Sequence, residues 1–260
     1  MIKLKSKVWR YITEKLQDEK VLHFTLIDPD PIKQTPDKAG YIAKIAEEAG
    51  SSAIMVGGST AFGILDDTII SIKENTSIPV ILFPGNINGI SKHADAIFFM
   101  SLLNSRNPYW IIQVHMLAAP IVKTYNLEAI PMGYLIFQPG GSAGFVGDVN
   151  LLPRNKPEIA AAYALAAQYL GFKLVYFESG SGASSPIPAK IISETKKILE
   201  IPLIVGGGII AADDAINLAK AGADIIVQGT FVEQCAFKDR GMKLKKIINA
   251  LTSSKKQHEK

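Results

Sequence analysis

The sequence is poor in the residues that form disulfides and zinc sites. Cys235 is the only cysteine among 260 residues, so no disulfide can form within the chain. The four histidines, at positions 23, 93, 115 and 258, are not spaced with one another as zinc ligands are. We therefore expect neither a disulfide-stabilised fold nor a zinc centre, and we assign the single cysteine no role.

The sequence also lacks a hydrophobic run long enough to span a bilayer. Its most apolar stretch, 109–122, is interrupted by Gln113 and His115 and is shorter than the roughly 20 residues that a transmembrane helix needs. The first 16 residues are amphipathic and have no apolar core of the signal-peptide kind. We expect a cytoplasmic protein without a transmembrane segment, in which 109–125 is either a buried helix or a surface for peripheral membrane contact.

A concentrated positive charge is missing as well. The net charge is only +4, and no basic stripe of the kind that binds nucleic acid occurs. The last eight residues, SSKKQHEK, carry much of this excess, and we expect them to form a flexible basic tail at 253–260. The charge balance suits a small anionic ligand, and no nucleic-acid partner is expected.

What the sequence does contain is a regular alternation of two kinds of segment. Short apolar runs are each followed by turn residues and then by a stretch with helical periodicity. Continuous apolar runs of this length are typical of parallel strands covered on both faces. The expected strands are 23–27, 53–56, 80–83, 96–102, 129–137, 174–177, 203–205 and 224–227.

Eight such alternations predict an α/β protein with a single (β/α)8 TIM-type barrel that spans residues 1–260 as one domain. An additional amino-terminal helix is expected at 1–18. The segment 84–95 is rich in glycine, asparagine and proline and is too short for a full helical connection, so the third helix of the barrel is expected to be shortened or missing. The long connection 138–153 after the fifth strand is expected to be a lid or a binding loop.

Barrels of this kind bind ligands at the carboxyl ends of their strands. The sixth, seventh and eighth strands are neighbours, and each ends in glycine, serine or threonine. Small residues of this type expose backbone N–H donors and let a phosphate approach closely. The pattern predicts a phosphate site, although the same glycines could simply make tight turns. The residues are Ser179, Gly180, Ser181, Gly182, Gly207, Gly208, Gly229 and Thr230.

Four further residues carry the expected chemistry. Glu178, at the end of the sixth strand, could accept a proton from a substrate hydroxyl, with Tyr176 on the same face. Asp28 and Ser59, after the first two strands, could form a sparse magnesium site of the kind that shares its ion with substrate phosphates. The alternatives are a rim glutamate, a core tyrosine and an aspartate that caps a turn.

Aromatic residues gather around the fourth and fifth strands. Beside a missing third helix they would border an apolar groove in the barrel wall, which suits a long hydrocarbon tail, although each aromatic taken singly is expected in the core. The group comprises Phe98, Phe99, Tyr109, Trp110, Tyr125, Tyr134 and Phe137.

Several long motifs resemble those of the geranylgeranylglyceryl phosphate synthases, in order and in spacing. They are HFTLIDPD, IMVGGST, EAIPMGYLIFQPG, GDVNLLPRNKPEIAAAYALAAQYLG, VYFESGSG, VGGGI and VQGTFVE, and together they cover about residues 11 to 234. The long central block and YFESGSG are specific, whereas VGGGI occurs in many phosphate-binding barrels. The central block is more similar to the archaeal branch of the family than to its bacterial heptaprenyl relatives.

The resemblance implies a magnesium-dependent prenyltransferase that joins the geranylgeranyl group of geranylgeranyl diphosphate to the sn-3 hydroxyl of sn-glycerol 1-phosphate. This reaction makes the first ether bond of archaeal membrane lipids. The resemblance also implies Mg²⁺ at Asp28 and Ser59, catalysis by Glu178 and Tyr176, and self-association into a homo-oligomer. Glycerol phosphate would be bound by Tyr176, Phe177, Glu178, Ser179, Gly180, Ser181, Gly182, Gly207, Gly208, Gly229 and Thr230.

The sequence departs from the family pattern at one position, and it leaves two alternative functions open. Many members carry asparagine at the position of Thr230, a change that a backbone N–H contact would survive. An isomerase or aldolase of sugar or indole phosphates would share the phosphate loops, but it calls for a lysine or paired aspartates at the strand ends. A non-catalytic carrier of prenyl phosphates would bind the same ligand without forming a product.

Overall fold

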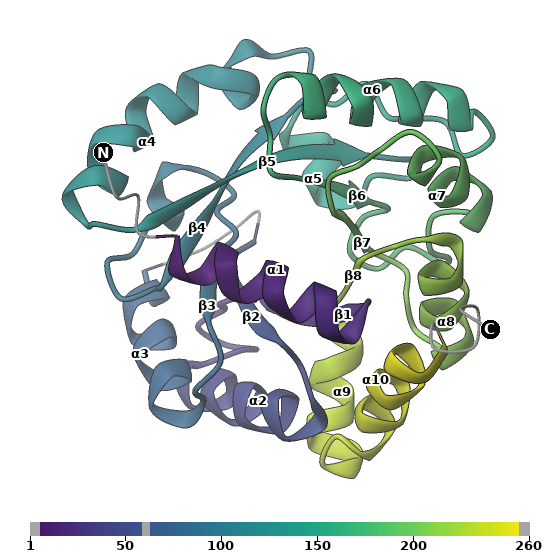
Figure 1. Cartoon of the computed structure of the whole chain (residues 1–260). Coiled ribbons are helices and arrows are strands. Elements are labelled where there is room, and N and C mark those ends of the chain that lie inside the picture. The colour runs from purple at the N-terminus through teal and green to yellow at the C-terminus, as the bar shows by residue number, and fades with distance from the viewer. Residues whose placement is uncertain (1–5, 59–62, 255–260) are drawn as a thin grey trace.

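The eight expected strands form one closed barrel of parallel strands (Figure 1). The computed structural model describes residues 6–58 and 63–254. Each predicted strand limit differs from the observed one by at most one residue, and β8 pairs with β1 to close the sheet. The strands are β1 (Leu22–Ile27), β2 (Ala53–Val56), β3 (Val80–Leu82), β4 (Ala96–Leu102), β5 (Glu128–Ile136), β6 (Leu174–Glu178), β7 (Leu203–Gly206) and β8 (Ile225–Gln228).

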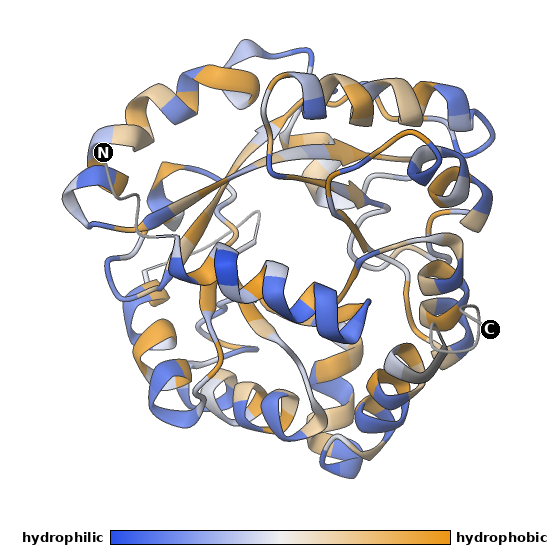
Figure 2. Ribbon diagram, viewed as in Figure 1, coloured by the Kyte–Doolittle hydropathy of each residue, from blue (hydrophilic) through white to orange (hydrophobic). Residues whose placement is uncertain are grey.

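Helices surround the barrel and turn their apolar faces towards it (Figure 2). In α2, the apolar positions 42, 45, 46 and 49 recur with helical spacing and are all buried, and Gly50 ends the helix with a φ of 105°. The helices are α1 (Lys7–Glu19), α2 (Pro36–Ala49), α3 (Leu65–Asn75), α4 (Val114–Thr124), α5 (Gly141–Val146), α6 (Pro157–Tyr169), α7 (Ala189–Lys196), α8 (Ala212–Ala221), α9 (Thr230–Asp239) and α10 (Met242–Ser254), with the π-helix η2 (Tyr109–Gln113) before α4.

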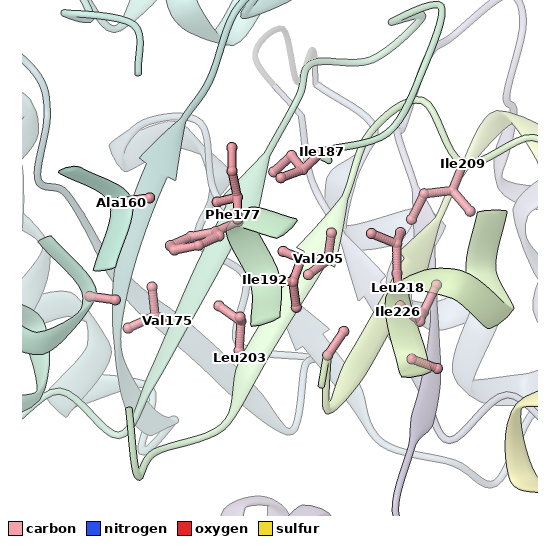
Figure 3. Packing of buried hydrophobic residues seen from close by; sticks show 14 of the residues in the cluster. Ala160, Val175, Phe177, Ile187, Ile192, Leu203, Val205, Ile209, Leu218 and Ile226 are labelled. Atoms are coloured by element: carbon pink, nitrogen blue, oxygen red, sulfur yellow. The ribbon is translucent and has the colours of Figure 1, made fainter. Parts of the chain in front are cut away.

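Alternation along the strands divides the core into an inner and an outer layer. On β6, Leu174 and Tyr176 pack inside the barrel, whereas Val175 and Phe177 pack outwards against the helices. Figure 3 shows this outer layer, in which Phe177 lies among Ala160, Ile187 and Ile192. Burial of both faces accounts for the continuous apolar runs in the sequence.

Helix α1 lies across one end of the barrel (Figure 1). Its buried residues Val8 and Ile12 join the inner core layer. The carboxylate of Glu128, the first residue of β5, accepts hydrogen bonds from the backbone N–H groups of Val8 at 2.7 Å and Trp9 at 2.9 Å. Since Glu128 starts its strand, α1 covers the amino-terminal end of the barrel, and ligands must enter elsewhere.

The helix expected to be shortened or missing is replaced by a single 3-10 turn. Between β3 and β4 the structure has only η1 (Ile87–Gly89), which confirms the prediction. These two strands also share the fewest registered pairs in the barrel, which are Ile81 with Ala96 and Leu82 with Ile97. By contrast, β4 and β5 share seven registered pairs.

The long connection 138–153 is folded rather than loose. It contains α5, and its second half returns beside the end of β5, where the Leu152 N–H donates to Ile136 O and the Gln138 N–H donates to Leu152 O, both at 3.0 Å. This return path places the residues after Leu152 next to the loops at the carboxyl ends of the strands.

The predictions for the two ends of the chain fall largely outside the described residues. The first described helix begins at Lys7, and α10 continues to Ser254, two residues into the predicted tail. Positions 1–5 and 255–260 lie outside the described residues. Among the helices that the structure describes, none is long and apolar enough to cross a membrane.

A buried histidine couples stability to pH. His23 is 1% exposed, its Nδ1 accepts from the Ser51 hydroxyl at 2.7 Å, and its Nε2–H donates to Gln228 Oε1 at 3.2 Å, an arrangement that suits the neutral ring. Burial lowers the pKa of His23 from 6.5 to about 4. The unfolded chain therefore binds a proton between these pH values that the folded chain does not, and stability falls as the pH is lowered.

We expect the loss of unfolding free energy between pH 7.5 and pH 4.5 to be smaller in His23→Gln than in the wild type, by up to about 3 kcal/mol. Guanidinium denaturation at the two pH values measures this difference. Equal losses in the two proteins would show that His23 takes up its proton as readily in the folded as in the unfolded state.

Candidate active site

A cavity of about 350 Å³ opens at the carboxyl ends of the strands. Its size falls in the range of small-molecule sites. At one end it is bordered by the polar residues Asp28, Glu178 and Ser181. At the other end it is bordered mainly by apolar residues of η1 and the segment after it, β4, η2 and α4, together with the polar Asn86 and His115. The apolar residues are Ile87, Ile90, Phe99, Trp110, Val114 and Ala118. The cavity therefore runs from the barrel mouth into the space left by the helix that is missing between β3 and β4.

Glu178 is the best-defined polar residue of this cavity. It is 7% exposed, and its Oε1 accepts a hydrogen bond from the Gly180 N–H at 2.6 Å. Burial raises the pKa of Glu178, and the bond from Gly180 acts in the opposite direction. Gly207 has a φ of 81°, and a Cβ there would lie only 2.2 Å from Oε1. Glycine at 207 thus leaves room for the carboxylate.

Asp28 lies across the cavity from β6, at the end of β1. Its side chain is exposed where it opens onto the cavity. Removal of water by the protein atoms packed around this carboxylate, followed by repulsion from Glu178 and Glu233, raises the pKa of Asp28. Gly58 leaves room beside this carboxylate, since a Cβ there would lie 2.8 Å from Asp28 Oδ1. The predicted partner Ser59 lies outside the described residues.

Tyr176 lies beneath the cavity in an aromatic cluster. Its ring stacks on Phe83 at 5.5 Å and meets Tyr134 edge-on at 5.3 Å. A Cβ at Gly206 would lie 2.1 Å from the Tyr176 hydroxyl, so this glycine also makes room for a functional group. The hydroxyl is buried beside the carboxylate of Glu178, with which it interacts. Burial and the charge of Glu178 raise the pKa of Tyr176 well above its ordinary value, so the hydroxyl stays protonated.

The structure brings the loops after β6 and β7 into direct contact. Besides facing Glu178, a Cβ at Gly207 would lie 2.8 Å from the Gly180 nitrogen. The hydrogen bonds among the described residues leave the N–H groups of Gly182, Gly207 and Gly208 without an acceptor. Free backbone donors on two loops that contact each other beside Glu178 suit a phosphate group.

The predicted residues Gly229 and Thr230 follow β8, the neighbour of β7 in the barrel. Gly229 precedes α9, and Thr230 is its first residue, so both lie at a helix amino terminus. They border a second cavity, of about 180 Å³, which they share with Asp28. Phe177 differs from the other predicted ligand residues, because its side chain packs against Phe137 in the outer layer and leaves only its backbone at the site.

The aromatic group expected to border a hydrocarbon groove is only partly assembled there. Phe98, Phe99, Trp110 and Tyr134 border the cavity. The Tyr109 hydroxyl donates to Asn86 Oδ1 at 2.7 Å and so ties η2 to the β3–β4 connection. Phe137 lies in the outer layer, and Tyr125 is 40% exposed at the end of α4, so neither contributes to the cavity.

Sequence reasoning missed two kinds of site residue. Gly58 and Gly206 act by the space they leave, which no sequence pattern reveals without knowing which side chain faces them. The sequence predicts no role for Arg154, which follows the connection 138–153, yet its guanidinium reaches the loop after β6. The signal available was its position, since a cation that follows a long connection at the carboxyl end of the barrel lies near the ligand face.

The site joins an apolar cavity to a buried carboxylate and a set of free backbone donors. Such an arrangement can hold a hydrocarbon and an anion side by side and can accept a proton between them.

Comparison with known proteins agrees with this geometry. The family model described as PcrB family matches residues 14–251. The geranylgeranylglyceryl phosphate synthase of Pyrococcus furiosus is 59% identical over 230 residues, which are 88% of this chain and 90% of that protein. That of Thermococcus gammatolerans is 54% identical over 247 residues, or 94% of this chain and 97% of the relative.

A solved structure shares both the fold and the sequence. The crystal structure of (S)-3-O-geranylgeranylglyceryl phosphate synthase from Thermoplasma acidophilum, in complex with its substrate sn-glycerol-1-phosphate, superimposes with a TM-score of 0.85 at 42% identity. The match covers 95% of this chain and 98% of that one. The chain therefore belongs to the PcrB family, in its archaeal branch of geranylgeranylglyceryl phosphate synthases.

Proposed function

We propose that this chain transfers the geranylgeranyl group of geranylgeranyl diphosphate to the sn-3 hydroxyl of sn-glycerol 1-phosphate and releases diphosphate. The observation that carries the proposal is the position of Glu178, whose buried carboxylate lies where the apolar cavity meets the glycine-rich loops. The names of the relatives support the choice of substrates. A cytoplasmic location and self-association belong to the same proposal.

The residues of the β6 and β7 loops define how glycerol phosphate would bind. The N–H groups of Gly182, Gly207 and Gly208 would donate to its phosphate, since none of them has another acceptor among the described residues. Its glycerol hydroxyl would then reach Glu178 Oε, and the Tyr176 hydroxyl, which lies beside Glu178, could donate to the same ligand. Fixing both reactants in this way makes the reaction effectively unimolecular, which can lower the barrier by roughly 7–11 kcal/mol.

The chemical step follows from these roles. The bond between the prenyl C1 and its diphosphate oxygen breaks, a bond forms between C1 and the glycerol oxygen, and the hydroxyl proton passes to Glu178. A carboxylate whose pKa is raised by burial is a stronger base than one in water. The apolar wall formed by Phe99, Trp110 and Val114 would hold the hydrocarbon and exclude water from the reacting carbon.

Asp28 fits a magnesium ion that is shared with a substrate. Its carboxylate opens onto the cavity, and desolvation by the surrounding protein, followed by repulsion from Glu178 and Glu233, disfavours its charged form unless a cation is near. No cluster of three or more metal-ligating side chains occurs in the described part of the chain, which matches an ion held chiefly by water and phosphate oxygens. Magnesium, when bound, would supply Lewis-acid stabilisation of the departing diphosphate.

We expect the purified protein, given sn-glycerol 1-phosphate, Mg²⁺ and a mixture of prenyl diphosphates, to form mainly the geranylgeranyl ether. Mass spectrometry of the products measures this outcome. The ether should be absent with sn-glycerol 3-phosphate or with a chelator. A different chain length would change the assignment of the cavity, and no ether from folded protein would exclude the transferase function.

The exchange of Glu178 for glutamine tests its role as the base. We expect Glu178→Gln to lower kcat by about 10²–10⁴-fold, because an amide cannot accept the hydroxyl proton, while its unfolding midpoint stays close to that of the wild type. Glu158→Gln, which changes an exposed carboxylate at the start of α6, serves as the control. A near-normal kcat in Glu178→Gln would remove this residue from the mechanism.

The Asp28→Asn variant should raise the Mg²⁺ concentration needed for half-maximal activity and weaken Mg²⁺-dependent binding of inorganic pyrophosphate in calorimetry. Removal of the repulsion that raises the pKa of Asp28 should also stabilise the metal-free protein. An unchanged Mg²⁺ titration together with unchanged pyrophosphate binding would contradict a metal role for Asp28.

A further inference from the structure

Arg154 binds four acceptors on two loops next to the candidate active site. Its Nη1 donates to Gln138 O and to Ser179 Oγ, each at 3.2 Å. Its Nη2 donates to Ser185 Oγ at 3.0 Å and to Pro186 O. One guanidinium therefore holds the start of the β5–α6 connection against both halves of the β6–α7 loop.

Local folding explains why Arg154 can reach these groups. The chain returns beside the end of β5 through the bonds of Leu152 with Ile136 and Gln138, and this path ends just before Arg154. The side chain is only partly exposed. A planar guanidinium presents its N–H groups in a fixed fork, so it can hold several acceptors at once in a way that an ammonium cannot.

The groups that Arg154 holds are linked to the reacting carboxylate. Ser179 is fully buried, its carbonyl accepts from the Gly140 N–H at 3.2 Å, and its N–H donates to Gly206 O at 3.2 Å. The next residue, Gly180, donates its N–H to Glu178 Oε1. A shift of Ser179 would therefore move the donor that orients Glu178.

The second half of the same loop supports the loop after β7. Gly208 has a φ of 68°, and a Cβ there would lie 2.4 Å from Ser185 O and 2.9 Å from the Pro186 nitrogen. The Ser185–Pro186 segment, which Arg154 binds, thus packs directly against the backbone at Gly208. None of the residues expected to bind glycerol phosphate is a lysine or an arginine, so the shape of these loops must carry much of the recognition.

We propose that Arg154 is a positioning residue that holds the loops after β6 and β7 in the shape that binds glycerol phosphate and orients Glu178. It acts through Ser179, Ser185 and Pro186 rather than by contact with the reacting atoms. The proposal rests on the proposed function for its substrate, whereas the loop geometry that it describes is independent of that function.

The test compares Arg154→Met and Arg154→Lys with the wild type, with Arg106→Met as the control. Arg106 also lies at the carboxyl end of the barrel, but it pairs with the exposed Asp148 of the β5–α6 connection and contacts none of the four groups that Arg154 holds. We expect Arg154→Met to raise KM for sn-glycerol 1-phosphate about tenfold or more and to lower kcat, while KM for geranylgeranyl diphosphate changes less than about twofold. Arg106→Met should behave as the wild type.

The Arg154→Lys variant separates shape from charge. It keeps the positive charge but not the fork, so it should resemble Arg154→Met, and added methylguanidinium should partly restore Arg154→Ala but not Arg154→Lys. Recovery of normal kinetics in Arg154→Lys would show that charge alone suffices. An equal rise in KM for both substrates would show a general structural effect. Either result would overturn the proposal.

A binding measurement tests the role of Arg154 independently of the proposed function. Calorimetry of sn-glycerol 1-phosphate and of inorganic phosphate should give a dissociation constant about tenfold weaker or more in Arg154→Met, at an unfolding midpoint close to that of the wild type. If the wild type binds these ligands without making an ether, the proposed function fails while the role of Arg154 is still decided. Unchanged binding in Arg154→Met would overturn the role of Arg154.

Discussion

The site depends on one short hydrogen bond, from the Gly180 N–H to the buried carboxylate of Glu178. This bond fixes the carboxylate at the end of β6 and turns the following residues towards β7. A buried carboxylate without such a partner would be costly. Gly206 and Gly207, at the end of β7, complete the arrangement by leaving space for the Tyr176 hydroxyl and for Glu178. Tyr176 and Glu178 of β6 can therefore occupy their positions because Gly206 and Gly207 at the end of β7 have no side chains.

Hydrophobic patterning was sufficient to predict the barrel, since each strand is buried on both faces and reads as a continuous apolar run. The missing third helix could also be predicted, because 84–95 is too short and too rich in turn residues to cross the barrel wall with a helix. The outward direction of the Phe177 side chain also follows from strand alternation, because Tyr176 and Glu178 on either side of it share the other face.

The candidate site could be predicted in part. The positions of Glu178 and Gly207 follow from the rule that ligands bind where barrel strands end. Gly58, Gly206 and Arg154 could not be found, because their roles depend on contacts between segments far apart in the sequence. Ser59 stays a prediction, as does the magnesium ion that it would share with Asp28.

β3 and β4 share fewer registered pairs than any other neighbouring strands of the barrel, two against seven between β4 and β5. These two strands are also connected without a full helix, and residues of η1 and β4 border the apolar end of the cavity. Local opening costs least where few backbone hydrogen bonds and few packed side chains must be broken. Opening of the sheet between β3 and β4 would therefore break fewer backbone contacts than opening between any other two neighbouring strands, and this opening would lie beside the apolar end of the cavity.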